Sequence, residues 1–359
     1  MKPRGATSEA VVVEAARLKS SRVLFVPGEF DLIAKYFTRP ARRAVLGVGD
    51  DCALLAPRPG FELAVSTDML VEGTHFLPGT DAARLGHKAL AVNLSDLAAM
   101  GAQPLYATLA LALPCVDEAW LAAFSRGFFG LADAHGVELI GGDTTRGPLN
   151  LCVTVIGEVP AGAAIRRSGA RAGDDIWVSG TLGDAALGLA YLKGGLKGGF
   201  KGAATKPPAA AAHAVARLEA PEPRVALGLS LRGVATAMLD VSDGLAGDLA
   251  HLALASGLAA RIDAESLPLS LASPLRAMPL TERLRYAAGG GDDYELCFTA
   301  APAQRDAVRA AGRSANVPVT KIGSMTAPES APGAVLIVDT DGNPCAATVS
   351  GHDHFRKMA

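Results

Sequence analysis

Acidic residues recur beside glycine, serine or threonine at the ends of apolar runs in this chain. The pattern occurs six times, at residues 49–51, 66–68, 93–96, 141–145, 240–244 and 290–295. Two carboxylates about 5 Å apart repel each other by roughly 3 kcal/mol at an effective dielectric constant near 20, so a cluster of them favours bound cations. An all-oxygen ligand set suits Mg²⁺ and the phosphates that it bridges. The pattern therefore predicts magnesium-dependent phosphoryl transfer, although each acid taken singly is also ordinary turn or cap chemistry.

Other residues near these acids suit a phosphate ligand. Glycines that would permit close backbone approach to phosphate oxygens are Gly47, Gly49, Gly141 and Gly142. Tight turns explain these glycines nearly as well. Arg166 and Arg167 suit a polyphosphate through forked hydrogen bonds, and a solvated linker is the equal alternative. The Gly/Lys-rich segment 193–212 lacks the GxxxxGK[ST] pattern, so a solvated insertion is expected there rather than a nucleotide site.

The elements that must position these residues are short strands and one long helix. Apolar runs at 63–68, 137–140 and 237–240 predict strands that end in Asp68, in the turn before Asp143, and in Asp240. Helical spacing from 82 to 100 places Asn93 and Asp96 on one helix face. Because strands of one sheet end at one edge, the acids are expected to converge on a single crevice in a mixed α/β fold.

The length of 359 residues favours two domains. Residues 1–27 are interpreted as an N-terminal tail that is a poor signal peptide. Residues 28–160 are expected to form an N-terminal α/β domain that binds metal and nucleotide and dimerises. Residues 161–359 are expected to form a C-terminal α/β domain with a flexible insertion at about 193–212.

Composition excludes several classes of protein. A net charge of −2 removes the electrostatic argument for a nucleic-acid or anionic-membrane binder. No apolar run reaches the roughly 18 residues that a membrane span needs. The 5 cysteines are odd in number and form no CxxC, which predicts reduced thiols, a cytoplasmic location and no zinc site.

The motifs together resemble those of the thiamine-monophosphate kinase family, and they occur in the family's order from Gly28 to Phe355. The matching runs are GEFDLIAKYF, GVGDDCALL, STDMLVEGTHF, GHKALAVNLSDLAAMGAQP, GGDTTRGPL, RSGARAGDDIWVSGTLGDAALGL, LDVSDGL, GGDDYELCFT and HDHF. The resemblance implies the two-domain aminoimidazole ribonucleotide synthetase-like fold, with N-terminal domains that pair in a homodimer. It also implies ATP-dependent phosphorylation of thiamine monophosphate to thiamine diphosphate with several Mg²⁺ ions.

The resemblance assigns roles motif by motif. The implied metal ligands are Asp51, Ser66, Thr67, Asp68, Asp96, Asp143, Asp240 and Asp243, of which Asp68 and Asp96 are expected to matter most. The implied ATP contacts are Gly142, Arg167 and Ser242, and the implied contacts to thiamine monophosphate are His75, Asp292 and His352. Two positions depart from the family's pattern, which commonly has Glu at position 292 and Trp or Tyr at position 352. Imidazole offers less apolar area for stacking than indole does.

The expected mechanism needs no general base, because a phosphate monoester with a second pKa near 6 is already mostly ionised at pH 7. No catalytic residue separate from the metal cluster is therefore assigned, and His75 is interpreted as a positioning contact. Two alternatives stay open. One is another ATP-dependent enzyme of the superfamily, although selenophosphate synthetases carry a reactive Cys or selenocysteine near the N-terminus and this chain has no Cys before Cys52. The other is a non-catalytic nucleotide-binding module, which has no reason to retain clustered carboxylates.

Overall fold

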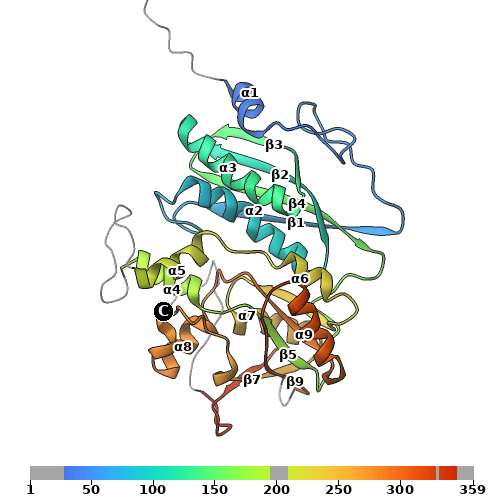
Figure 1. The fold of residues 1–359 in the computed structure, drawn as a ribbon, viewed down its shortest axis with the longest axis vertical. Helices are drawn as coiled ribbons and strands as arrows, with labels where there is room; N and C mark the ends of the chain where they lie inside the picture. The colour runs from blue at the N-terminus through green and yellow to red at the C-terminus, as the bar shows by residue number, and fades with distance from the viewer. Residues whose placement is uncertain (1–27, 195–208, 329–330, 346–359) are drawn as a thin grey trace, which may run out of the picture.

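The chain folds into two halves, each built on one β-sheet (Figure 1), and the computed structural model describes residues 28–194, 209–328 and 331–345. The N-terminal half contains α1 (Glu29–Leu32), the π-helix η1 (Ile33–Phe37), β1 (Phe61–Val71), α2 (Ala82–Ala99), β2 (Gln103–Leu113), α3 (Glu118–His135), β3 (Glu138–Arg146) and β4 (Asn150–Pro160). The C-terminal half contains β5 (Asp175–Ser179), α4 (Asp184–Leu192), α5 (Ala209–Glu219), α6 (Val225–Ser230), β6 (Ala237–Val241), α7 (Leu245–Ala255), β7 (Ala259–Asp263), η2 (Ala264–Ser266), η3 (Pro274–Ala277), α8 (Leu280–Ala287), β8 (Glu295–Ala300), η4 (Pro302–Gln304), α9 (Arg305–Ser314), β9 (Val319–Thr326) and β10 (Val335–Val338).

The N-terminal sheet has the strand order β1-β4-β2-β3, so β1 and β3 are its two edges. β4 runs antiparallel to β1 and β2, whereas β2 and β3 are parallel. Alternate residues of β4 are buried, and α2 packs against β1, β2 and β4. On β1 the alternate apolar residues Leu63, Val65 and Met69 stay exposed. Because successive side chains of a strand point to opposite faces, one face of the sheet is the core and the other is open.

The two long helices of the N-terminal half, α2 and α3, begin at aspartate caps and cross closely. Asp81 Oδ1 accepts a hydrogen bond from the Arg84 backbone N–H at 2.9 Å, and Asp117 caps α3 in the same way. At the crossing, a Cβ placed on Gly127 would lie 1.8 Å from the Ala83 carbonyl oxygen. Glycine therefore sets the distance between α2 and α3, and this distance fixes where α2 presents its polar residues.

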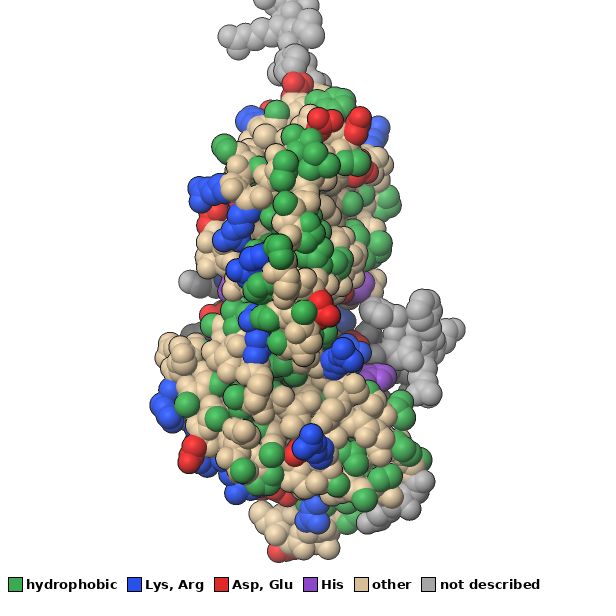
Figure 2. Space-filling model, turned by 90° about the vertical axis from the view of Figure 1, so that its right-hand side faces the viewer, with side chains coloured by type: hydrophobic (Ala, Val, Ile, Leu, Met, Phe, Trp, Pro, Cys, Tyr) green, Lys and Arg blue, Asp and Glu red, His purple; other side chains and the backbone are tan. Residues whose placement is uncertain are grey.

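The C-terminal sheet has the order β10-β7-β9-β5-β8-β6, and α2 lies where it meets the N-terminal half. α2 contacts β1 and β4 on one side, and α5, α6, β6 and β8 on the other. Nearly every residue of α2 from Leu85 to Ala99 is therefore buried. Figure 2 shows the molecule narrowing where the two halves meet, with hydrophobic side chains gathered on the N-terminal half of this view.

The predicted mixed α/β class and the predicted helix at 82–100 are confirmed by the two sheets and by α2. Two of the three predicted strand ends are wrong, because β1 continues past Asp68 to Val71 and β3 continues past Asp143 to Arg146, whereas β6 ends at Val241, one residue past Asp240. Pairing with β4 and β2 extends both strands beyond the acids. The expected loop at 193–212 is also wrong at its end, since Ala209 begins α5, as the high helix propensity of alanine favours. Residues 1–27 and 195–208 lie outside the described residues.

No helix in the part of the chain that the structure describes is long and apolar enough to cross a bilayer.

Candidate active site

Four carboxylates from both halves of the molecule gather beside α2, and we call them the interdomain acidic cluster: Asp68 on β1, Asp96 on α2, Asp240 on β6, and Asp243 in the turn after β6. Hydrogen bonds with Ser66, Ser95 and Asn93 hold three of these residues in place. Ser66 Oγ donates to Asp96 Oδ2 at 2.5 Å, and Ser95 Oγ donates to Asp240 Oδ2 at 2.7 Å. The Asp68 backbone N–H donates to Asn93 Oδ1 at 3.0 Å, which joins β1 to α2.

Burial makes the carboxyl groups of Asp68, Asp96 and Asp240 reluctant to ionise, and neighbouring carboxylates add to this at Asp68 and Asp240. Burial, together with the charges of Asp96 and Asp243, raises the pKa of Asp68 to about 6. Burial, together with the charge of Asp96, raises the pKa of Asp240 to about 7. Burial also raises the pKa of Asp96, although the Ser66 hydroxyl and the Arg167 guanidinium oppose the shift. A cation bound between these carboxylates would therefore stabilise their ionised form and lower their pKa values.

A pH dependence of stability follows from these shifts. The folded-state pKa values of Asp68 and Asp240, about 6 and about 7, lie above the roughly 3.9 of an unfolded Asp, so the folded state binds more protons between about pH 4 and pH 7. Without Mg²⁺, the melting temperature of the wild type is expected to fall relative to that of Asp240→Asn as pH rises from 5 to 8. At pH 8 the variant should melt roughly 3 °C higher or more. Differential scanning fluorimetry of both proteins across this range tests it, and a difference in melting temperature that does not change with pH would contradict the raised pKa values.

The turn after β6 is held by a buried acid that sequence reasoning missed. Asp248, on α7, accepts hydrogen bonds through Oδ2 from the backbone N–H groups of Ser242 and Asp243, at 3.0 and 3.1 Å. Burial raises the pKa of Asp248 to about 7, with the Asp243 charge adding to it and Arg167 opposing it. Asp248 therefore fixes Ser242 and Asp243, and Arg167 lies within electrostatic reach of this turn and of Asp96.

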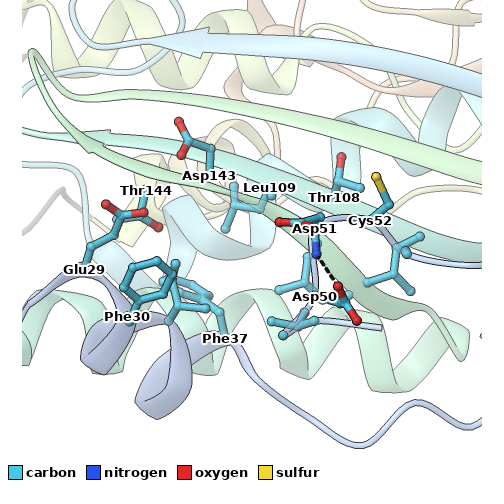
Figure 3. Close-up of a pocket in the computed structure, with 18 residues that line it drawn as sticks. Glu29, Phe30, Phe37, Asp50, Asp51, Cys52, Thr108, Leu109, Asp143 and Thr144 are labelled. Atoms are coloured by element: carbon cyan, nitrogen blue, oxygen red, sulfur yellow. Dashed lines mark hydrogen bonds between the residues drawn. The ribbon is translucent and has the colours of Figure 1, made fainter. Parts of the chain in front are cut away.

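A second group of predicted residues lies apart from this cluster, in a cavity of about 640 Å³ beside β3 (Figure 3). Asp51, Gly142 and Asp143 line it together with Thr108 and Cys52. Gly142 has φ +150°, and a Cβ there would lie 1.8 Å from the Leu109 carbonyl oxygen, so this backbone requires glycine. The Asp51 and Asp143 carboxylates reach the same cavity from a loop and from a strand.

The strand order separates the two groups within one chain. Asp143 on β3 pairs with Ala110 on β2, and Ala110 pairs with Cys152 on β4. Cys152 in turn pairs with Met69 on β1, the residue that follows Asp68. Three strand spacings, about 14 Å, therefore lie between the backbones of β3 and β1. Thr67 points away from its neighbours Ser66 and Asp68, and its hydroxyl bonds that of Thr154 at 2.8 Å. The acids predicted as one cluster thus form two groups on opposite edges of the N-terminal sheet.

Two of the three residues expected to contact the phosphate acceptor share a small pocket of about 40 Å³ between the two halves. His75 and Asp292 line it, together with Phe76 and with Leu189 and Leu218 from α4 and α5. The His75 ring accepts a hydrogen bond at Nδ1 from the Val71 backbone N–H at 3.0 Å. The third residue, His352, lies outside the described residues.

Two further buried charged groups received no role in the sequence analysis, Lys88 and Glu295, the latter at the end of the acidic run 290–295. Lys88 on α2 makes an ion pair with Asp292 in which Nζ lies 2.8 Å from Oδ1. Glu295 on β8 is buried between Arg217 and Arg224 and accepts from Ser179 Oγ at 2.6 Å. An available signal for Lys88 was that it is the lone lysine of the predicted helix and directly precedes the apolar run ALAV.

No three His, Cys, Asp or Glu side chains in the described parts of the chain are placed to hold a metal ion by themselves. Mg²⁺ commonly takes only one or two protein carboxylates and completes its shell with substrate phosphates and water. The cluster therefore has the donor chemistry of a site that forms together with a phosphate ligand.

Family models match both halves of the chain. Residues 49–159 match the AIR synthase related protein N-terminal domain, and residues 171–332 match the corresponding C-terminal domain. The chain is 49% identical over 331 residues to the thiamine-monophosphate kinase of Escherichia coli K12, covering 91% of this chain and 98% of that protein. It is 34% identical over 335 residues to that of Bacillus subtilis, covering 91% of this chain and 99% of that protein.

Solved structures agree with these relatives. The thiamine-monophosphate kinase of Stenotrophomonas maltophilia has 50% identity and a TM-score of 0.75, over 84% of this chain and 92% of that chain. AaThiL complexed with AMPPCP and TMP has 30% identity and a TM-score of 0.69, over 84% and 89% of the two chains. From the matched domains and the near full-length identity, the chain belongs to the thiamine-monophosphate kinase family.

Proposed function

We propose that the protein transfers the γ-phosphoryl group of ATP to the phosphate of thiamine monophosphate, forming thiamine diphosphate and ADP. The interdomain acidic cluster carries the proposal, because it brings carboxylates of both halves to one place where a cation and the phosphate that it bridges would offset their repulsion. The pocket with His75 and Asp292 lies at the same junction between the halves. The binding of AMPPCP and TMP by a 30% identical relative supports both substrates.

Magnesium fits the residues that are present. The donors are carboxylates and hydroxyls, which Mg²⁺ prefers, and Asp68, Asp96 and Asp240 come together from both halves, where a bound cation would offset their charges. We assign metal binding to Asp68, Asp96, Asp240 and Asp243 with Ser66 beside them, to Thr67 on the opposite face of β1, and to Asp51 and Asp143 across the sheet. Bound Mg²⁺ would neutralise phosphate charge as the phosphoryl group transfers.

The chain's own residues act by positioning. The acceptor phosphate is already mostly ionised at neutral pH, so the protein needs no base to activate it. It must hold two anions in line and offset their repulsion. We assign ATP contacts to Gly142, Arg167 and Ser242, the last held by Asp248. We assign the contacts to thiamine monophosphate to His75, Asp292 and His352.

The separation of the two acidic groups favours a homodimer. β1 and β3 are the two edges of the N-terminal sheet, and the open face carries exposed apolar residues, Val65 at 62% and Met69 at 52%. A two-fold pairing of these sheets would cover the apolar face and place the β1 edge of one chain beside the β3 edge of the other. In that dimer each complete site takes Asp68 and Asp96 from one protomer and Asp51 and Asp143 from its partner.

Substitution on the open sheet face is expected to separate the protomers. Val65→Arg places a charge where the two sheets would pack, so light scattering should fall from roughly twice the 36.6 kDa chain mass to the mass of one chain, and turnover should fall with it. Leu271→Arg is the matched control, because Leu271 is an 89% exposed apolar residue in the C-terminal half. A monomeric wild type with full activity would contradict the dimer.

Calorimetry and turnover together separate catalysis from mere binding. Titration with AMPPCP and then with thiamine monophosphate should show two binding events, and ATP in place of AMPPCP should give turnover. Binding without turnover would identify a non-catalytic nucleotide-binding module. Turnover with ATP alone, unaffected by thiamine monophosphate, would identify a different acceptor.

A further inference from the structure

Lys88 is a buried lysine at the centre of the junction between the two halves. Its side chain is 4% exposed, and lysine is almost never buried this deeply without a charged partner. Its Nζ donates to Asp292 Oδ1 at 2.8 Å and lies 3.4 Å from the carbonyl oxygen of His75. One ammonium group therefore contacts both of the described residues that we assign to thiamine monophosphate, one from each half of the molecule.

The backbone at Asp292 is fixed independently of this ion pair. Asp292 has φ +68°, an uncommon conformation for a residue other than glycine, and its N–H donates to the Ser242 carbonyl oxygen at 2.8 Å. Its side chain is 30% exposed and lines the small pocket together with Lys88 itself. The backbone therefore fixes the position of the Asp292 Cα atom. The hydrogen bond from Lys88 then orients the Asp292 carboxylate.

We propose that Lys88 is a positioning residue for the acceptor pocket, which holds the Asp292 carboxylate and the His75 segment in the arrangement that binds thiamine monophosphate. The inference rests on the proposed function for the identity of that ligand. A buried ammonium is a good positioning group, because little water reaches it and because it gives the partly exposed Asp292 carboxylate one strong, charged donor.

The alternative is that Lys88 only ties the two halves together, without orienting Asp292 or His75. A residue on the same helix provides the matched control for this alternative. Arg84 lies one turn before Lys88 and makes its own contact with the C-terminal half, with Nη1 2.6 Å from Glu219 Oε2 on α5. Its side chain is 47% exposed. Arg84→Met therefore removes an ion pair between the halves without touching Asp292 or His75.

The test compares Lys88→Met, Lys88→Arg and Arg84→Met by steady-state kinetics. Lys88→Met should raise KM for thiamine monophosphate by about tenfold or more, with KM for ATP and kcat within about threefold. Lys88→Arg should recover part of the loss, since a guanidinium also pairs with a carboxylate. Arg84→Met should leave KM for thiamine monophosphate within about twofold. Equal losses in Lys88→Met and Arg84→Met, or a loss in kcat alone, would overturn the proposal.

A second comparison remains decisive if Lys88→Met folds poorly. The double variant Lys88→Met/Asp292→Asn should have a KM for thiamine monophosphate within about threefold of that of Asp292→Asn, because Lys88 has no carboxylate left to hold and only its 3.4 Å contact with the His75 carbonyl oxygen remains. A rise over Asp292→Asn as large as that of Lys88→Met over the wild type would show that Lys88 acts independently of Asp292 and would overturn the positioning role. Calorimetric titration of thiamine monophosphate into the same variants tests Lys88 even if the wild type forms no thiamine diphosphate, an outcome that would instead refute the proposed function.

Discussion

Asp68→Asn and Asp96→Asn are each expected to lower kcat by at least about a hundredfold, near 2.7 kcal/mol in activation free energy. Asparagine keeps nearly the volume of aspartate but removes the charge that would hold Mg²⁺ against the transferring phosphate. The fold should survive. Without Mg²⁺ the variants should melt higher than the wild type, because burial disfavours ionisation at both positions and the charges of Asp96 and Asp243 add to this at Asp68. The melting shift on adding Mg²⁺ and ATP should shrink.

Asp306→Asn is the control for these two variants. Asp306 lies on α9 with its side chain 99% exposed, far in the fold from the cluster, so turnover and the metal-induced melting shift should match those of the wild type. Unchanged turnover together with an unchanged Mg²⁺ shift in Asp68→Asn and Asp96→Asn would show that these acids only cap or solvate their elements, and the assigned metal ligands would be wrong.

Two inactive variants are expected to regain activity when mixed if each site takes residues from both protomers. Asp68→Asn changes the β1 side of the site and Asp143→Asn changes the β3 side. In a heterodimer of the two, one site carries both substitutions and the other carries neither. After subunit exchange, random pairing makes half of the dimers heterodimers, so about a quarter of wild-type turnover should return.

Mixing Asp68→Asn with Asp96→Asn is the matched control for this experiment. Both residues lie on the same side of the site, so no heterodimer has an intact site and turnover should stay at the level of the single variants. Turnover should be measured after unfolding and refolding the chains together, which guarantees exchange. Equal recovery in both mixtures, or none in either despite proven exchange, would contradict a site shared between protomers.

Local sequence patterns predict the elements of this fold well. The helical spacing at 82–100 and the apolar runs before Asp68, Asp143 and Asp240 correspond to α2, β1, β3 and β6. The convergence of Asp68, Asp96 and Asp240 has a different cause from the expected one. Asp68 and Asp240 belong to different sheets, and α2 between those sheets brings them together.

The missed features depend on long-range pairing. The order β1-β4-β2-β3 places Asp143 and Asp68 on opposite edges, and no local pattern encodes which strands become neighbours. Lys88 and Asp248 read locally as ordinary charged positions in helices. Their roles appear only when the C-terminal half covers α2, which leaves Lys88 buried against Asp292, and when α7 places Asp248 under the turn at Ser242.

The central claim is tested most directly by the products formed when the purified protein is mixed with ATP, Mg²⁺ and thiamine monophosphate. Chromatography should show thiamine diphosphate and ADP appearing in equal amounts while thiamine monophosphate disappears, and neither product should form when Mg²⁺ is removed by a chelator. Formation of ADP without thiamine diphosphate, or thiamine monophosphate left unchanged, would contradict the account.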